Sequence, residues 1–451
     1  MSCRAPARAT LAIPLLILVP AIAHAKVTIQ GTGTVTAGYT DNVLNAPDQP
    51  TAGASPREGD ALFQLIPGVV IASLAPRFME RLVYTFTADL FARHSEADSY
   101  SNMLDWAGTF LISPTSRLTL TLDTQQGRIS TFTINQPSSG TTVGVLAQNN
   151  STNFFSQDVA EDLDTTPAPG WRVTQGAFFR AFVTIDRGKL PDSYNAIASV
   201  GAERLFAKDA VGLTLSANFV QYIQPRDPTT DVPLGFDDKQ VLTSLAARWR
   251  RDWSPMWNTE ADLGVISLVG ASADPTASTE TTWQPSALAA LRWVRDIGSA
   301  ELHYLHTATP NSLAGNTFAV DEVALQAGVP LLRAKMLIGA TVAYQHAKLI
   351  ALAPDAPQAT ADLALLDVTI GYQALAWLRV FVRYSLYDQF GSPAVNGAPS
   401  ALPDLTRNVV MAGANVVYPA VAAVRAPLRG AARVDEADQQ AFPEPHAAPP
   451  Q

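Results

Sequence analysis

The chain contains a single cysteine, Cys3, at its very start. A basic beginning and a mostly apolar stretch over residues 10–22 precede Ala23-His24-Ala25, a pattern typical of an export signal. We therefore interpret residues 1–25 as a signal peptide that is cleaved before Lys26. Cleavage would remove the cysteine, so the mature protein could form no disulfide, thiolate nucleophile or cysteine-based metal site.

The sequence also lacks long hydrophobic runs and a strong charge. After residue 25 no stretch of apolar residues is long enough for a transmembrane helix. The formal net charge of −9 argues against nucleic acid as a partner. Yet 47% of the residues are hydrophobic and only 16% are charged. Two classes fit these values: a large soluble β-protein, or a closed membrane barrel whose apolar side chains face lipid.

Helical periodicity is nearly absent, and apolar residues instead recur at every second position. Residues 333–347 illustrate the pattern, with an apolar face that includes Met336 and Val342. The opposite face is polar and begins with Arg333 and Lys335. Similar segments recur along the chain, so the sequence predicts an all-β protein.

The breaks between these segments are alternately short and long, which is typical of outer-membrane barrels with short periplasmic turns and long external loops. The alternation holds only if residues 152–166 form a further, weaker strand before a turn at 167–170. The pattern predicts a transmembrane antiparallel up-and-down β-barrel over residues 26–418, with about eighteen strands and sixteen as the fallback. Residues 419–451, rich in alanine and proline, are predicted to be a disordered periplasmic tail.

Two tryptophans provide a test of the dimensions. Trp283 and Trp293 share one face of a predicted strand. At roughly 3.3 Å per residue and a tilt of about 40°, they are separated by about 25 Å along the membrane normal, as two aromatic girdles would be. The alternative is a pair of tryptophans in a soluble core. Pro285, between them, does not fit a strand with two neighbours.

We find no arrangement of residues that supports catalysis or a cofactor. His303 and His306 resemble a metal pair, but residues three apart on a strand point to opposite faces. Glu260 and Asp262 share a face, where they could attract a cation or could simply be carboxylates of a wet wall. GTGTVTAG (31–38) is followed by no helix that could bind phosphate. We expect no enzyme activity, no cofactor and no metal.

The predicted inward faces carry charges of both signs. The positive candidates are Arg81, Arg93, Arg117, Arg180, Arg248, Arg250, Arg292, Arg333, Lys335, Arg379 and Arg383. The negative candidates are Asp89, Asp105, Asp123, Asp186, Glu203, Glu260, Asp262, Glu301, Glu322 and Asp367. This near balance suits a neutral polar cargo such as a sugar, or it reflects charges that neutralise one another. A barrel of this size leaves room for an aqueous channel.

The stretch VTAGYTDNVLNAP (35–47) marks the end of the first predicted strand. We expect Tyr39 near the external aromatic girdle. Asp41 and Asn42 would cap the strand, because these residues bond readily to nearby backbone in turns. A carbohydrate or calcium site at this rim is the alternative.

Three short segments stand out: GYTDNV at 38–43, SRLTLTLDTQ at 116–125 and TRNVVMAGANVVY at 406–418. In these segments the chain resembles outer-membrane β-barrel proteins associated with exopolysaccharide assembly and export in proteobacteria and myxobacteria. The resemblance implies passage of polysaccharide or related envelope material across the outer membrane. Unlike polysaccharide porins that carry periplasmic helical repeats, this sequence has none, so a separate periplasmic component would have to supply that contact.

The sequence thus favours a conduit for exported polysaccharide in the bacterial outer membrane, with both termini periplasmic. The alternatives are a general diffusion porin and a structural or adhesive barrel with a closed lumen. No segment is obviously built to fold inward as a constriction, although 135–151 could. The expected partners are outer-membrane lipid and lipopolysaccharide, the barrel-assembly machinery, polysaccharide and periplasmic export components, and no nucleic acid.

Overall fold

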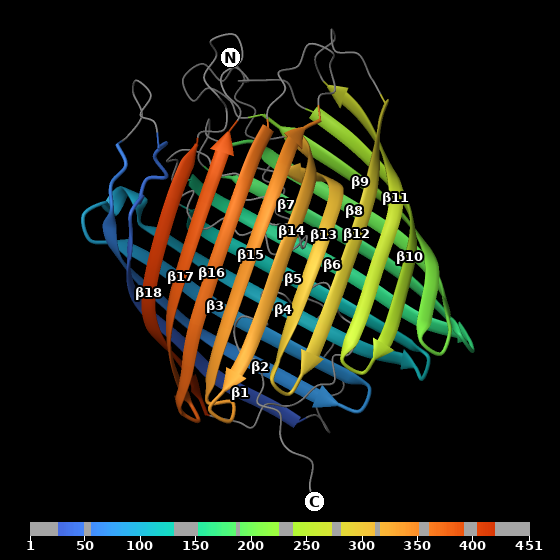
Figure 1. The fold of residues 1–451 in the computed structure, drawn as a ribbon, viewed down its shortest axis with the longest axis horizontal. Coiled ribbons are helices and arrows are strands. Elements are labelled where there is room, and N and C mark those ends of the chain that lie inside the picture. Colours follow the sequence, from blue (N-terminus) through green and yellow to red (C-terminus); the bar gives the residue numbers. More distant parts are fainter. Residues whose placement is uncertain are drawn as a thin grey trace, which may run out of the picture.

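The structure, a computed structural model, describes residues 26–48, 56–129, 152–185, 190–224, 238–272, 281–311, 316–350, 360–391 and 404–419. The predicted signal peptide (1–25), the 135–151 segment and nearly all of the predicted tail lie outside these residues. The described chain forms one barrel of antiparallel strands (Figure 1). The strands are β1 (Lys26–Thr40), β2 (Asp60–Ala75), β3 (Phe78–Phe91), β4 (Ser99–Ser113), β5 (Ser116–Ile129), β6 (Thr152–Ala168), β7 (Trp171–Thr184), β8 (Asp192–Leu205), β9 (Asp209–Ile223), β10 (Asp238–Ser254), β11 (Trp257–Ser272), β12 (Thr281–Arg295), β13 (Gly298–Asn311), β14 (Asn316–Leu331), β15 (Met336–Leu349), β16 (Thr360–Leu375), β17 (Leu378–Gly391) and β18 (Leu405–Tyr418).

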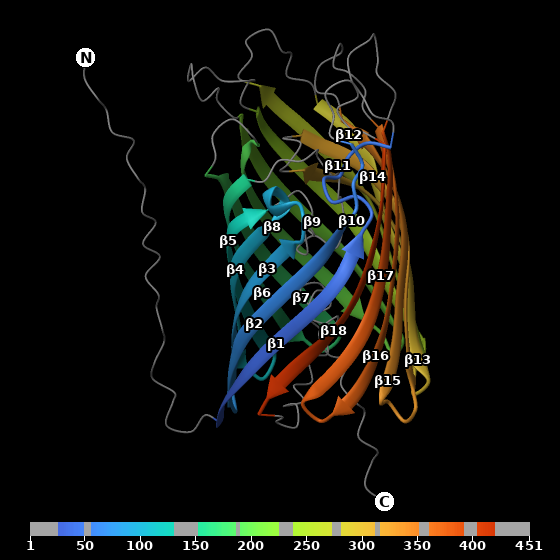
Figure 2. The same cartoon turned by 90° about the vertical axis from the view of Figure 1, so that its left-hand side faces the viewer.

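Each strand pairs with its neighbours in the chain, and β1 closes the barrel by pairing with β18. The closing ladder runs from Gly31–Tyr418 to Thr40–Val409. Figure 2 shows β1 lying between β2 and β18. The predicted eighteen-stranded up-and-down barrel is therefore confirmed, including β6, which was predicted only from the alternation of the breaks.

The connections confirm the predicted asymmetry. Short turns join β2 to β3, β4 to β5, β6 to β7 and so on around one end of the barrel, which we call the turn end. We call the opposite end the loop end. There β3 is followed by a single 3₁₀ turn, η2 (Ser95–Ala97), before β4 begins. Both β1 and β18 have their outer termini, Lys26 and Tyr418, at the turn end.

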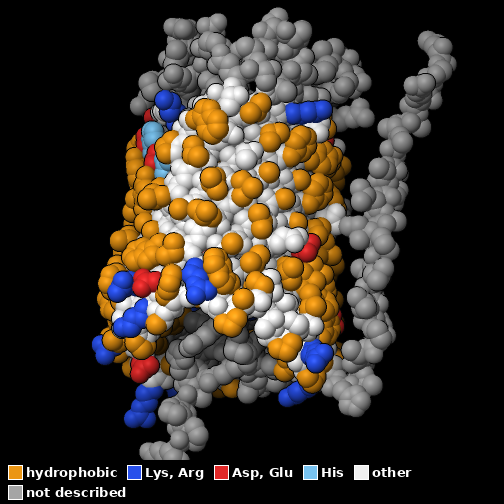
Figure 3. All heavy atoms as spheres, turned by 90° about the vertical axis from the view of Figure 1, so that its right-hand side faces the viewer, with side chains coloured by type: hydrophobic (Ala, Val, Ile, Leu, Met, Phe, Trp, Pro, Cys, Tyr) orange, Lys and Arg blue, Asp and Glu red, His pale blue; other side chains and the backbone are white. Residues whose placement is uncertain are grey.

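Side chains alternate between the outer wall and the lumen along each strand, as the pleat requires. The outer wall carries exposed apolar side chains such as Leu213, Val342 and Val410. Figure 3 shows apolar side chains over the height of one face, with most charged side chains toward the turn end and a few near the loop end. Trp283 and Trp293 both lie on this outer face, and Trp283 is 65% exposed. The wall thus has the apolar outer band of a membrane-spanning barrel. No helix within the described ranges is long and apolar enough to cross a membrane.

Small residues allow close approach where the barrel closes. An added Cβ on Gly38 would lie 2.3 Å from the Val410 carbonyl oxygen, and one on Gly413 would lie 2.5 Å from that of Val35. Gly38 and Gly413 are therefore explained by close packing at the β1–β18 ladder, whereas a Cβ on Gly31 or Gly33 would meet no such obstacle.

Candidate functional site in the barrel lumen

The pairing registers place most of the predicted lumen residues on inward-facing positions. These are Arg81, Asp89, Asp105, Arg117, Asp123, Arg180, Glu203, Arg248, Arg250, Glu260, Asp262, Arg292, Glu301, Glu322, Asp367, Arg379 and Arg383. Strongly exposed apolar side chains mark the outward positions of each strand, and the side chains between them face inward.

Three of the predicted residues do not line the wall. Arg333 and Lys335 lie in the exposed turn between β14 and β15, where Leu332, Arg333 and Ala334 all have positive φ angles. Polar and apolar residues continue to alternate through this turn, so the predicted strand began at residue 333, whereas β15 begins at Met336. Arg93 follows the end of β3, and its guanidinium bonds to Gly59 and Asp60 at the rim of the loop end. Asp186 lies outside the described residues.

A chain of alternating charges runs along the inner wall near the turn end. We call it the charge belt: Arg117, Asp164, Arg172, Glu203, Arg248, Glu260, Asp262, Arg292 and Glu301. Its shortest contacts join Arg172 to Asp164 at 2.8 Å and Arg292 to Glu301 at 2.8 Å. Arg248 lies 3.0 Å from Asp262 and 3.6 Å from Glu203. Arg117 stands at one end of the belt and contacts Asp164, and each of the other arginines contacts at least two carboxylates. The belt is therefore one connected network of ion pairs.

The belt crosses β9 because that strand offers no side chain at the crossing point. Glu203 comes from β8 and Arg248 from β10, with Gly212 of β9 between them. A Cβ on Gly212 would lie 2.7 Å from Cγ of Glu203. Any other residue here would therefore displace Glu203 from Arg248.

A second set of charges lies farther from the turn end, on β4 to β7. Asp105 pairs across the ladder with Asp123, and Asp123 pairs with Asp158. Arg180 bonds to Asp158 through two contacts of 2.8 and 2.5 Å. One arginine thus faces a row of three carboxylates.

Several inward charges were missed in the sequence, and four of them lie on the neighbouring strands β6 and β7. Asp158, Asp162 and Asp164 occupy alternate positions of β6, and Arg172 begins β7. Their signal was present as period-two spacing, but β6 was predicted as a weak strand and its face was not assigned. With these residues included, acidic side chains outnumber basic ones on the described inner wall. The predicted near balance of charge is therefore wrong.

His303 and His306 point to opposite faces of β13, which confirms the prediction. His303 faces inward, and its Nε2 lies 2.9 Å from Glu322, whose side chain is 3% exposed. His306 faces outward and contacts Asp321 through Nδ1 at 2.7 Å. Within the described ranges, no group of three or more histidine, cysteine or acidic residues is arranged to hold a metal.

The rim of the loop end agrees with the predicted strand cap. Asn42 is buried and exchanges hydrogen bonds of 2.8 Å with both backbone groups of Ala46. Asp41 accepts hydrogen bonds from the backbone and side-chain nitrogens of Asn408 and pairs with Arg57 at 2.6 Å. Burial opposes ionisation of Asp41, but these bonds outweigh it and lower its pKa. The two residues thus tie β1 to β18.

A second rim contact joins the β2 and β3 ends. His94 donates its Nδ1 proton to the buried Asp60 at 2.9 Å, and its Nε2 lies 2.9 Å from Glu58. The bond to Asp60 raises the pKa of His94 despite the opposing effect of burial.

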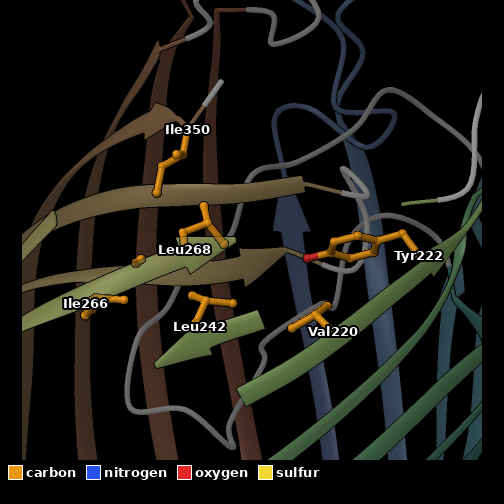
Figure 4. Close-up of a cluster of buried hydrophobic side chains, with 7 residues drawn as sticks. Val220, Tyr222, Leu242, Ile266, Leu268 and Ile350 are labelled. Carbon is orange, nitrogen blue, oxygen red and sulfur yellow. The ribbon is translucent and has the colours of Figure 1, made fainter. Parts of the chain in front are cut away.

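The loop end of the lumen is narrowed by the ends of β13 and β14, which we call the inner tip: residues 307–311 and 316–320. The hydroxyl of Thr317 in this tip donates to Gln240 of β10. Ala308 and Ala319 of the tip and Ile350, just after β15, pack with Val220, Leu242 and Leu268. Figure 4 shows the side chains of β9, β10 and β11 in this cluster together with Ile350. The tip therefore leans into the barrel, a constriction that the sequence did not reveal.

Comparisons with known proteins find only distant structural similarity. No protein-family model matches this chain, and no curated protein matches it either. Among solved structures, the chain is similar to OccK9 (OpdG) of Pseudomonas aeruginosa, with 13% identity over 88% of this chain and 99% of that one, at a TM-score of 0.45. It is similar to the siderophore receptor PiuA of Acinetobacter baumannii, with 10% identity over 87% and 82% and a TM-score of 0.44. These values assign no cargo.

Proposed function

We propose that the protein is an outer-membrane channel for small polar solutes, with a preference for cations. The observation that carries this proposal is the inner wall, which is lined with charged and polar side chains from the turn end to the inner tip and has an excess of carboxylates on β4 to β6. The outer apolar band supports an outer-membrane location, with the turn end toward the periplasm.

The inner tip favours a diffusion channel over an open conduit. It leans into the lumen from β13 and β14 and contacts β10, so it reduces the cross-section through which a solute passes. Size-limited passage of small solutes is the expected result. The charge belt would replace water contacts of a moving ion weakly and at many sites, so that no single site binds it tightly.

A second candidate is the polysaccharide conduit expected from the sequence. One observation favours it: β1 presents a column of uncharged polar side chains to the lumen, made of Thr28, Gln30, Thr32 and Thr34. Such a column suits a neutral sugar chain, which needs many weak hydrogen bonds. Export components and polysaccharide would then be partners, and deletion of the gene would reduce surface polysaccharide.

Ion selectivity in planar bilayers tests the channel proposal. We expect single-channel conductance and a reversal potential that indicates cation preference under a KCl gradient. Replacing Asp105 and Asp123 with asparagine should reduce that preference, because both carboxylates face the lumen. Asp321→Asn is the matched control, since Asp321 lies on the outer face and should leave selectivity unchanged. A barrel that never conducts would instead support the closed, structural alternative.

A further inference from the structure

The ladder between β12 and β13 stops short of the loop end. Its last pair is Ala287 with His306. Beyond it, residues 281–286 of β12 pair only with β11, and residues 307–311 of β13 pair only with β14. Figure 1 shows β13 and β14 turning away from β12 at this height. Among the residues that the structure describes, two facing strand edges thus have no ladder partner, and we call the space between them the seam.

Both edges of the seam carry a proline. Pro285 lies in β12 and Pro310 in β13, each within the segment that has no partner across the seam. Proline lacks a backbone N–H and is found on edge strands, because a central position would lose a ladder hydrogen bond. The two prolines therefore agree with strand edges that have no ladder partner across the seam.

The seam lies at the height of the aromatic girdle farther from the turn end. Trp283, on the outer face, pairs with Ser267 of β11, and Leu268 next to Ser267 points inward. The seam thus lies beside β12, the strand next to β11, whose inner face carries Ile266 and Leu268 of the inner apolar cluster. Elsewhere the lumen at this side is polar, with Ser216, Ser244 and Asn218 on β9 and β10.

The inner apolar patch consists of Val220, Tyr222, Leu242, Ile266 and Leu268, and every one of these side chains is at most 6% exposed. What covers it is the inner tip, through Ala308 and Ala319, together with Ile350. The tip contributes two alanines, so its contact surface is small. An alkyl chain entering from the membrane could cover the same patch once the tip moves away.

We propose that the seam is a lateral portal for amphiphilic molecules, with the inner tip as the element that closes it. An acyl or alkyl chain would enter between β12 and β13 and lie on the inner apolar patch, while its polar head would face the hydrophilic lumen. This function is additional to axial passage of solutes and does not depend on it.

Photo-crosslinking in phospholipid vesicles tests the portal. The photoreactive residue 4-benzoylphenylalanine replaces Leu268 in one variant and Ala308 in a second, which guards against misfolding of the first. The control position is Val70, an inward-facing residue of β2 on a fully paired part of the wall. We expect phospholipid acyl adducts, identified by mass spectrometry, from positions 268 and 308 and not from 70. Absence of lipid adducts at both seam positions in folded protein would overturn the proposal.

A disulfide lock tests the role of the tip. Gln240→Cys with Thr317→Cys joins the tip to β10, because these two side chains already touch. The matched control is Ser216→Cys with Ser244→Cys, whose hydroxyls lie 2.7 Å apart on neighbouring wall strands. Oxidation should abolish lipid adducts at position 268 in the tip lock alone, and reductant should restore them. Equal adducts with the tip locked and unlocked would show that the tip does not close the seam. Conductance recorded on the same samples reports the axial channel separately.

Discussion

The barrel has two junctions that differ in an unexpected way. β1 and β18 are farthest apart in the chain, yet their ladder is continuous from Gly31–Tyr418 to Thr40–Val409. β12 and β13 are joined by a short turn, yet their ladder ends at Ala287–His306. Chain connectivity therefore does not decide which junction is closed.

Local side chains explain the difference. The β1–β18 junction has glycines where backbones approach closely, and Asp41 bonds across it to Asn408. The β12–β13 junction has a proline on each side and an alternative partner for its tip on β10. One junction is built to seal the wall, and the other leaves two edges unpaired.

The largest effect should come from crowding the sealed junction. In Gly38→Val, the new side chain would meet the Val410 carbonyl and Met411, so we expect a loss of about 1–3 kcal/mol, the usual range for overpacking. The measurement is the temperature at which the folded barrel is lost in detergent gels. Gly339→Val is the matched control, because no atom lies within 4 Å of a Cβ added there. Equal melting of both variants would contradict the assigned packing.

A smaller effect is expected from removing the hydrogen bond that holds the inner tip on β10. Gln240→Ala with Thr317→Ala removes the side-chain hydrogen bond that holds the inner tip, at a cost of about 1 kcal/mol. The barrel should remain folded, and its conductance should rise or fluctuate more because the tip leaves the lumen more often. Ser216→Ala with Ser244→Ala removes a comparable wall bond away from the tip. A conductance change of the same size in that control would count against the tip as the constriction.

The smallest effect should be a pH dependence at the rim beside the sealed junction. Because the pKa of His94 is raised in the folded state, its bond to Asp60 stabilises the fold most when the histidine is protonated. This contribution is present below about pH 6.5, the ordinary value for histidine, and is lost as the pH rises through the raised pKa. Thermal stability of the wild type relative to His94→Gln should therefore decline with rising pH. A constant difference across that range would argue against a titrating contact.

Much of the fold could be predicted from the sequence, because a strand with one face on lipid and one on water shows its period directly. The turns, the two tryptophans and the strand cap at Asp41 and Asn42 follow from local patterns. Arg333 and Lys335 were misplaced because alternation alone does not show where a strand becomes a turn.

The candidate site was predicted only in part. Most inward charges follow from strand parity, but the charge belt also depends on Gly212, whose importance appears only when β8 and β10 are placed around it. The seam depends on contacts between Thr317 and Gln240, which are distant in sequence. Pro285 was its one local sign, and it was interpreted as an irregularity in an ordinary strand.

Paired cysteines across the two junctions test the central comparison most directly. Tyr39 and Val410 are register partners in the β1–β18 ladder, so Tyr39→Cys with Val410→Cys should form a disulfide readily. Extending the β12–β13 register beyond Ala287–His306 would bring Pro285 opposite Ala308. We predict that Pro285→Cys with Ala308→Cys does not crosslink in folded protein. Efficient crosslinking of this second pair would show a continuous ladder and would contradict the seam.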